Sequence, residues 1–224
     1  MTRAYTQRLR ADQFAETRTR ILARARELLP NADGIKVEEI ARRAGVSVPT
    51  LYSHFGSKVG LLSALVGEIE TEAGLFVSFE RVWRCPDGES ALRTMLEATL
   101  GFWQQAWIFI DFGLRVRRTD PELGARFDRL DRSRLGHLVV ICRRLRDERR
   151  LRKGATPERA ARLAFALTTP YVFEALALQG GVPAPTAVRM IANAALDAVI
   201  SPGSVPIRSD AIDWPRLGLR PPVS

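Results

Sequence analysis

The sequence predicts an all-α fold, in which a small three-helix N-terminal domain with a helix-turn-helix precedes a larger helical domain. Apolar residues recur at helical spacing along most of the 224 residues, and no alternating strand pattern or hairpin turn competes with them. Breaks that contain glycine or proline, most of them beside a capping side chain, divide the chain into segments of helix length.

The chain begins with a basic N-terminal arm, residues 1–12, whose arginines are Arg3, Arg8 and Arg10. Such an arm is either a solvated tail or a segment that reaches along a DNA backbone. A first amphipathic helix follows and ends before Pro30-Asn31. Its apolar positions are Phe14, Ile21, Leu22, Ala25, Leu28 and Leu29. This helix supplies the third wall of a small core within residues 13–56.

Residues 36–55 are typical of two short helices joined by a turn at Gly45, where a left-handed backbone costs least. The first helix has an apolar face at i, i+3, i+4 and i+7, made of Val37, Ile40, Ala41 and Ala44. The second repeats this spacing with Val48, Leu51, Tyr52 and Phe55, which we expect to pack inward. The residues expected to face solvent are Pro49, Thr50, Ser53 and His54.

The start of the second helix has two candidate N-caps. Pro49 fits its first turn, but proline pushes the preceding residue out of the helical region, so either Ser47 or Val48 is the cap. In either case free N–H groups and the positive helix end point outward, where a phosphate would bind. A protruding helix with small polar side chains fits the DNA major groove.

A further helix begins at Ser57 and runs to about Glu72. Lys58 lies in its first turn, where a cation opposes the helix dipole. Since an external phosphate would compensate, Lys58 is a candidate phosphate contact. Val59-Gly60 stand where an acidic residue would complete a capping box with Ser57, so we expect that box to be missing.

The motif Ile40-Ala41-x-x-Ala44-Gly45-Val46-Ser47, followed by Thr50-Leu51-Tyr52-x-His54-Phe55-x-Ser57-Lys58 and Leu61-Leu62, is similar to the N-terminal domain of TetR-type bacterial transcriptional regulators. The resemblance covers roughly residues 14–65. It implies a homodimeric repressor that binds a double-stranded, pseudo-palindromic DNA operator and releases it when its C-terminal domain binds a small molecule.

The resemblance also implies a set of phosphate and groove contacts, namely Ser47, Pro49, Thr50, Tyr52, His54 and Lys58. Our predicted DNA-binding set adds Lys36, Arg43 and Ser53. Lys36 stands where the family often has a hydroxyl N-cap for the first helix of the motif.

The charge distribution agrees with a polyanionic partner. The chain has 34 Lys and Arg against 25 Asp and Glu, a formal charge of +9. Residues 1–58 alone hold 11 basic and 6 acidic side chains, which leaves +4 for the much longer remainder. The basic excess therefore lies where the motif lies.

Composition argues against catalytic and metal-dependent functions. Cys85 and Cys142 follow no metal or redox spacing, and the chain has only two histidines, His54 and His137. We find no glycine-rich phosphate loop, signal peptide or run of about 18 apolar residues. We therefore expect a cytoplasmic protein with free thiols that is no enzyme, holds no metal or cofactor and contacts no membrane. The alternative is a ligand-binding or enzymatic helical protein with a basic surface and no sequence-specific role on DNA.

Residues 57–200 are expected to form a helical effector-binding and dimerisation domain. Its breaks are Cys85-Pro86-Asp87-Gly88, Thr119-Asp120-Pro121, Gly154-Ala155-Thr156-Pro157 and Gly180-Gly181-Val182-Pro183. The candidate caps are Asp87 or Ser90, Thr119 or Asp120, and Thr156. We expect residues 90–118 to break near Gln105-Ala106. Residues 201–224 are predicted to be a proline-rich extended tail, which Trp214 could attach to the surface.

Two parts of this domain have two possible interpretations each. The arginine-rich segment 123–152 is either a second nucleic-acid surface or the solvated face of a helix. The last helices carry wide stripes of small and apolar residues, which are either ordinary core or a dimer interface. The stripe residues are Ala160, Leu163, Ala164, Leu167, Val188, Ile191, Ala192, Ala195, Leu196 and Val199.

An aromatic run, residues 102–112, is either plain core or the wall of an effector pocket. The predicted effector-binding residues are Trp103, Trp107, Asp111, Phe112, Phe127, His137, Tyr171, Phe173 and Glu174. We expect Thr169-Pro170 to bend its helix and expose backbone carbonyls to the ligand. Such a pocket favours an apolar effector of modest size, and a carboxylate at Asp111 or Glu174 would favour cations or hydrogen-bond donors.

Overall fold

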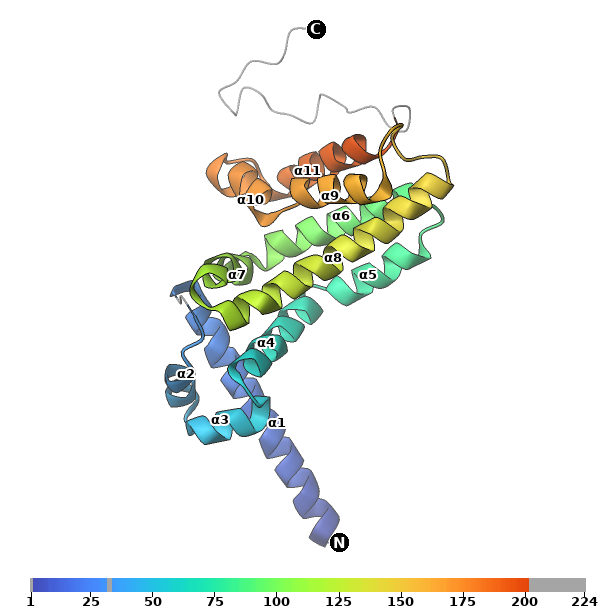
Figure 1. Cartoon of the computed structure of the whole chain (residues 1–224). Coiled ribbons are helices and arrows are strands. Elements are labelled where there is room, and N and C mark those ends of the chain that lie inside the picture. Colours follow the sequence, from blue (N-terminus) through green and yellow to red (C-terminus); the bar gives the residue numbers. More distant parts are fainter. Residues whose placement is uncertain (1, 32–33, 202–224) are drawn as a thin grey trace. The chain divides into compact units, whose positions relative to one another are not determined.

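The computed structural model describes residues 2–31 and 34–201, which are helical apart from short connections (Figure 1). Within these ranges no strand forms beyond one antiparallel bridge, between Leu151 and Ile200. The predicted all-α fold is therefore confirmed. Residues 202–224, which include most of the predicted tail and Trp214, lie outside the described part of the chain.

The chain divides into two compact units, and the first holds the described residues up to Glu72 together with Trp107–Arg129. Its elements are α1 (Thr2–Leu28), the 3₁₀ turn η1 (Leu29–Asn31), α2 (Val37–Ala44), α3 (Val48–Phe55), α4 (Lys58–Glu72), α7 (Trp107–Thr119) and the beginning of α8 (Pro121–Asp147). The division does not follow the predicted boundary at residue 57, because α4, α7 and the start of α8 group with the helix-turn-helix.

The N-terminal arm is not a separate extended segment, since α1 is helical from Thr2 onward. Arg8 and Arg10 lie exposed on this first part of the helix. The core of the unit begins further along α1 and continues on α2, α3 and α4. Its buried side chains are Ile21, Leu22, Ala25, Leu29, Val37, Ile40, Ala41, Ala44, Leu51, Phe55, Leu61, Leu62, Leu65, Val66 and Ile69.

The second unit holds Ala73–Ala106 and the described residues from Leu130 onward. Its elements are α5 (Leu75–Arg84), α6 (Gly88–Gln105), the rest of α8, α9 (Pro157–Leu167), α10 (Pro170–Phe173), the π-helical turn η2 (Glu174–Gln179) and α11 (Ala184–Val199). α6 packs against α5 and α11, and α11 also packs against α9 (Figure 1).

Side chains near the breaks in the sequence cap the beginnings of several helices. Asp87 caps α6, because the Ser90 N–H donates to its carboxylate at 2.7 Å. Thr156 caps α9 through the Arg159 N–H, and Asp120 accepts from the Leu123 N–H at the start of α8. The predicted break falls at Ala106, between α6 and α7.

Among the described helices, none is by itself both long and apolar enough to cross a membrane. The pair formed by α9 and Pro170–Gln179, which is bent by 42°, passes the same test, but by length and composition only.

Candidate nucleic-acid interface

The predicted reading head is the helix-turn-helix of residues 36–55. Its shape depends on the turn between α2 and α3 and on the caps of these two helices. Gly45 adopts a φ of 65°, which a residue with a side chain rarely does, and this lets the chain leave α2 and enter α3. Ser47, and not Val48, is the N-cap of α3, because its hydroxyl accepts from the Thr50 N–H at 3.2 Å. The N-terminus of α3 is therefore closed by a small polar side chain.

The outward face of α3 is small and polar, and two of its four predicted residues, Pro49 and Ser53, are exposed. Ser47, Pro49 and Ser53 are exposed, and Thr50 is half-buried with its hydroxyl 2.8 Å from that of Ser47. Such a surface brings hydroxyl groups and the helix N-terminus to the outside of the domain.

Two positions on α3 differ from the prediction. Tyr52 is exposed, not packed inward, because the buried stripe of this eight-residue helix consists of Leu51 and Phe55. His54 is half-buried, since its ring stacks on Phe14 of α1 with 3.9 Å between centroids. Among the described residues, His54 Nδ1 is buried and has no hydrogen-bond partner.

Two arginines of α1 hold the helix-turn-helix, and the sequence patterns did not identify them. Arg18 donates to the carbonyl of His54 at 2.9 Å and lies over the Phe55 ring at 4.5 Å. Arg20 donates to the carbonyl of Ala44 at 2.9 Å. Both therefore satisfy carbonyls at helix C-termini, where a cation also favours the helix dipole. Only the spatial meeting of α1 with α2 and α3 reveals this role.

The two predicted basic contacts on and before α2 have different surroundings. Lys36 is exposed, and its side chain makes no N-cap bond to α2. Arg43 is ion-paired with Glu39 at 2.6 Å, and Arg42 pairs with the same carboxylate at 2.7 Å. Hydrogen bonds from Arg42 and then Arg43 lower the pKa of Glu39 to about 2. A phosphate would therefore compete with Glu39 for both arginines.

The start of α4 agrees with the prediction at Ser57 and departs from it at Lys58. Ser57 caps the helix, since the Gly60 N–H donates to its hydroxyl at 3.0 Å, and Gly60 lacks the acidic side chain that a capping box needs. A side chain at Gly60 would collide with the Phe55 carbonyl, its Cβ being only 1.9 Å from that oxygen, which explains the glycine. Lys58 is not an unengaged cation, because its ammonium forms an ion pair with Asp120.

We expect His54 to make the first unit sensitive to acid. Burial, and to a smaller extent the positive charge of Arg18, lowers the pKa of His54 below its ordinary value. The unfolded chain therefore takes up this proton at a higher pH than the folded chain, so stability falls as the pH drops below about 6.5. Between about pH 7.5 and about pH 5.5, the melting temperature should fall less in H54Q than in the wild type.

S53A, which changes the exposed neighbour of His54 on the same helix and removes no titratable group, is the matched control and should keep the wild-type fall in melting temperature. An H54Q variant that loses as much stability on acidification as the wild type would contradict this assignment.

The predicted effector-binding residues divide between the two units. Trp107, Asp111, Phe112 and Phe127 belong to the first. There Phe127 packs edge-on against Phe112, and Asp111 is ion-paired with Arg115 at 3.1 Å. The carboxylate expected to favour cationic ligands therefore already has a cationic partner.

The second unit holds Trp103, His137, Tyr171, Phe173 and Glu174. His137 lies between Phe79 and Trp83, with ring centroids 5.6 and 5.7 Å away.

Three of the other four residues lie on α10 and at the start of η2. Tyr171 is exposed, Phe173 is buried, and Glu174 accepts from the Gln179 amide at 3.3 Å.

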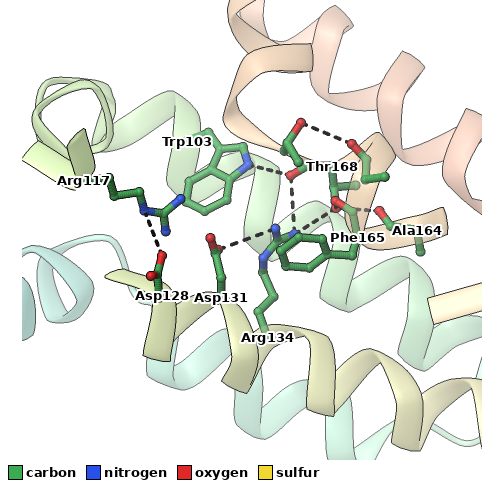
Figure 2. Close-up of polar contacts among 10 residues, drawn as sticks. Trp103, Arg117, Asp128, Asp131, Arg134, Ala164, Phe165 and Thr168 are labelled. Atoms are coloured by element: carbon green, nitrogen blue, oxygen red, sulfur yellow. Dashed lines mark hydrogen bonds and ion pairs between the residues drawn. The ribbon is translucent and has the colours of Figure 1, made fainter. Parts of the chain in front are cut away.

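The bend at Thr169-Pro170 occurs as predicted, but the carbonyl that it frees is used within the chain. The Thr168 carbonyl accepts from the Trp103 indole at 3.0 Å and from Arg134 at 3.4 Å (Figure 2). Arg134 is 7% exposed, and its guanidinium stacks on Phe165 at 3.9 Å. The expectation that this carbonyl faces a ligand is therefore wrong, because a helix break buried in a core takes its hydrogen bonds from neighbouring side chains.

Residues 21–65 match the sequence profile of the family described as bacterial regulatory proteins, tetR family. No curated protein sequence matches the chain. The matched range covers the last eight residues of α1, the helix-turn-helix and the first half of α4, so it includes the described reading head.

Solved structures share the fold over most of the chain. FadR from Bacillus subtilis, solved with stearoyl-CoA, is 16% identical, with a TM-score of 0.64 over 80% of this chain and 98% of its own. NalD from Pseudomonas aeruginosa, a secondary repressor of the MexAB-OprM multidrug efflux pump, is 22% identical, with a TM-score of 0.61 over 84% and 98%. The SmeT–triclosan complex is also 22% identical, with a TM-score of 0.65 over 84% and 93%.

The helix-turn-helix domain therefore belongs to the TetR family of bacterial regulatory proteins, and the chain shares the fold of solved TetR-family regulators, such as PfmR from Thermus thermophilus, along most of its length.

Proposed function

We propose that this regulator is a dimeric repressor that binds a specific DNA operator and leaves it when a small-molecule effector binds. The observation that supports this most is the two-sided character of α3. Leu51 and Phe55 hold the helix in the core, while the opposite side presents Ser47, Pro49 and Ser53 to solvent. A helix held in this way can enter a major groove without loss of fold stability.

The proposed DNA contacts are Lys36, Arg43, Ser47, Pro49, Thr50, Tyr52, Ser53, His54 and Lys58. The exposure of Tyr52 supports its place in this set, since a tyrosine hydroxyl is a common donor to phosphate. His54 has a weaker case, because its ring is stacked on Phe14. We assign DNA binding to residues 13–56, with residues 57–200 for effector binding and dimerisation and residues 201–224 as a tail.

The proposed dimer interface uses the last helices of the second unit. Part of their predicted stripe is intramolecular core, because Ala164 on α9 and Ile191 and Ala195 on α11 are buried within the chain. Leu163 on the same α9 is exposed, as is Leu178 on η2. Since exposed large apolar side chains favour association, we propose that this face meets a second copy across a two-fold axis.

We propose an apolar effector of modest size, bound in the helical domain by some of the aromatic residues predicted above. The structures of two relatives contain triclosan and stearoyl-CoA, each of which has a large apolar part. A cationic effector has less support at Asp111 than the sequence indicated, because that carboxylate is ion-paired with Arg115, whereas Glu174 only accepts a hydrogen bond from the neutral Gln179 amide. Release of DNA requires that the effector prefer one of two conformations of the dimer.

Selection of duplexes from a random-sequence pool tests the proposal directly. We expect the full chain to enrich a pseudo-palindrome with half-sites about one helical turn apart, or a multiple of it, bound by two subunits. Apolar acyl compounds and aromatic acids are then added to that complex. Tryptophan fluorescence follows effector binding in the wild type and in Trp107→Ala, and the operator affinity of each protein shows whether the DNA is released. Enrichment of no sequence, or a monomer bound to an asymmetric site, would overturn the proposed function.

A further inference from the structure

The predicted phosphate contact at the start of α4 has a carboxylate partner inside its own unit. Lys58 Nζ and Asp120 Oδ2 form an ion pair, although 62 positions separate the two residues. The side chains are only 30% and 16% exposed. The pair is therefore partly shielded from water, which strengthens it relative to a fully solvated pair.

Asp120 is held in place by its role in a helix cap. Its second carboxylate oxygen, Oδ1, accepts from the Leu123 N–H at 3.1 Å, and its carbonyl accepts from the Gly124 N–H at 2.8 Å. Burial by itself would raise the pKa of Asp120, but the hydrogen bonds from Lys58 and from Leu123 lower it below the ordinary value. The carboxylate is thus ionised and oriented at neutral pH.

The turn that carries Asp120, between α7 and α8, is also attached to the same unit on either side of the pair. Arg115 of α7 donates to the Leu29 carbonyl at 3.1 Å, and Arg126 of α8 donates to the Ser63 hydroxyl at 3.3 Å. The position of the carboxylate beside Lys58 therefore does not depend on the ion pair alone.

We propose that Asp120 competes with a DNA phosphate for Lys58 and so acts as a built-in counter-anion that lowers the protein's affinity for duplex DNA. A lysine contributes to DNA binding by neutralising a phosphate and releasing its counterion. When an internal carboxylate already neutralises that lysine, the phosphate must first displace it, and the carboxylate also repels the DNA. This inference rests on the proposed DNA-binding function.

The competing explanation is that the pair only secures the turn between α7 and α8. In that case loss of Asp120 weakens the unit and either leaves DNA binding unchanged or reduces it. The two explanations thus predict opposite changes in affinity.

The test compares the wild type, D120N, K58Q and the double variant K58Q/D120N. Asparagine keeps an oxygen for the α8 cap while it removes the charge. E122Q is the matched control, because it removes one negative charge from an exposed side chain in the first turn of the same helix. Affinity is measured by fluorescence anisotropy on a 30-base-pair duplex from the selection and on a shuffled duplex of the same composition.

We expect D120N to bind both duplexes about threefold to thirtyfold more tightly, and E122Q to change binding less than about twofold. The slope of log affinity against log salt should steepen by about 2 per dimer, one phosphate for each subunit. The gain should vanish in K58Q/D120N, because it depends on the lysine.

The inference is wrong if D120N binds no more tightly than E122Q, or if the gain persists without Lys58. If the wild type prefers the selected duplex to the shuffled one but D120N gains no affinity, the inference is wrong and the proposed function still stands. Absence of that preference overturns the proposed function, whatever D120N does. If D120N melts well below the wild type, D120S, which also supplies a capping oxygen, replaces it.

Discussion

Raising the salt concentration from about 50 mM to about 200 mM should weaken operator binding by roughly three decades. A dimer with about 6 to 10 phosphate contacts would lose between three and five decades over this interval. We expect the lower end, because three of the basic side chains nearest the reading head already have carboxylate partners. Arg42 and Arg43 pair with Glu39, and Lys58 pairs with Asp120.

The measurement is a titration of labelled operator at several chloride concentrations and fixed pH. A shuffled duplex is the control, since phosphate contacts carry no sequence information and should give a steep slope of their own. Binding that falls less than about tenfold over the interval would show that phosphate contacts are too few for the proposed interface.

The replacement of Leu51 by alanine should unfold the reading head. Leu51 is 0% exposed and lies at the centre of a small core shared by α1 to α4. Loss of a buried leucine costs about 2 to 5 kcal/mol, a large part of the stability of a domain of this size. We therefore expect a thermal transition well below that of the wild type and no operator binding at physiological temperature.

Ser53→Ala is the matched control on the same helix. Ser53 is exposed, and its hydroxyl donates only to the Thr50 carbonyl one turn earlier, at 2.7 Å. Its loss should change the unfolding free energy by less than about 0.5 kcal/mol. The thermal transitions of both variants are measured by circular dichroism. An L51A melting curve that overlays that of the wild type would contradict the assignment of Leu51 to the core.

Sequence alone determined the features that depend on residues within one or two helical turns. Gly45 marks the turn because of its backbone freedom, and Leu51 and Phe55 mark the buried side of α3 by their spacing. Asp87 and Thr156 cap their helices through N–H groups three positions away. Periodicity and capping act locally, so their outcome can be predicted before the rest of the chain is placed.

Only the tertiary structure decided which partners the polar and aromatic side chains take. Lys58 meets Asp120, His54 stacks on Phe14, and the carbonyl freed at Thr168 accepts from Trp103 and Arg134. Each of these contacts joins residues more than 30 positions apart. No local pattern encodes them, because a buried charge or carbonyl pairs with whatever group the packing of the helices brings within hydrogen-bond distance.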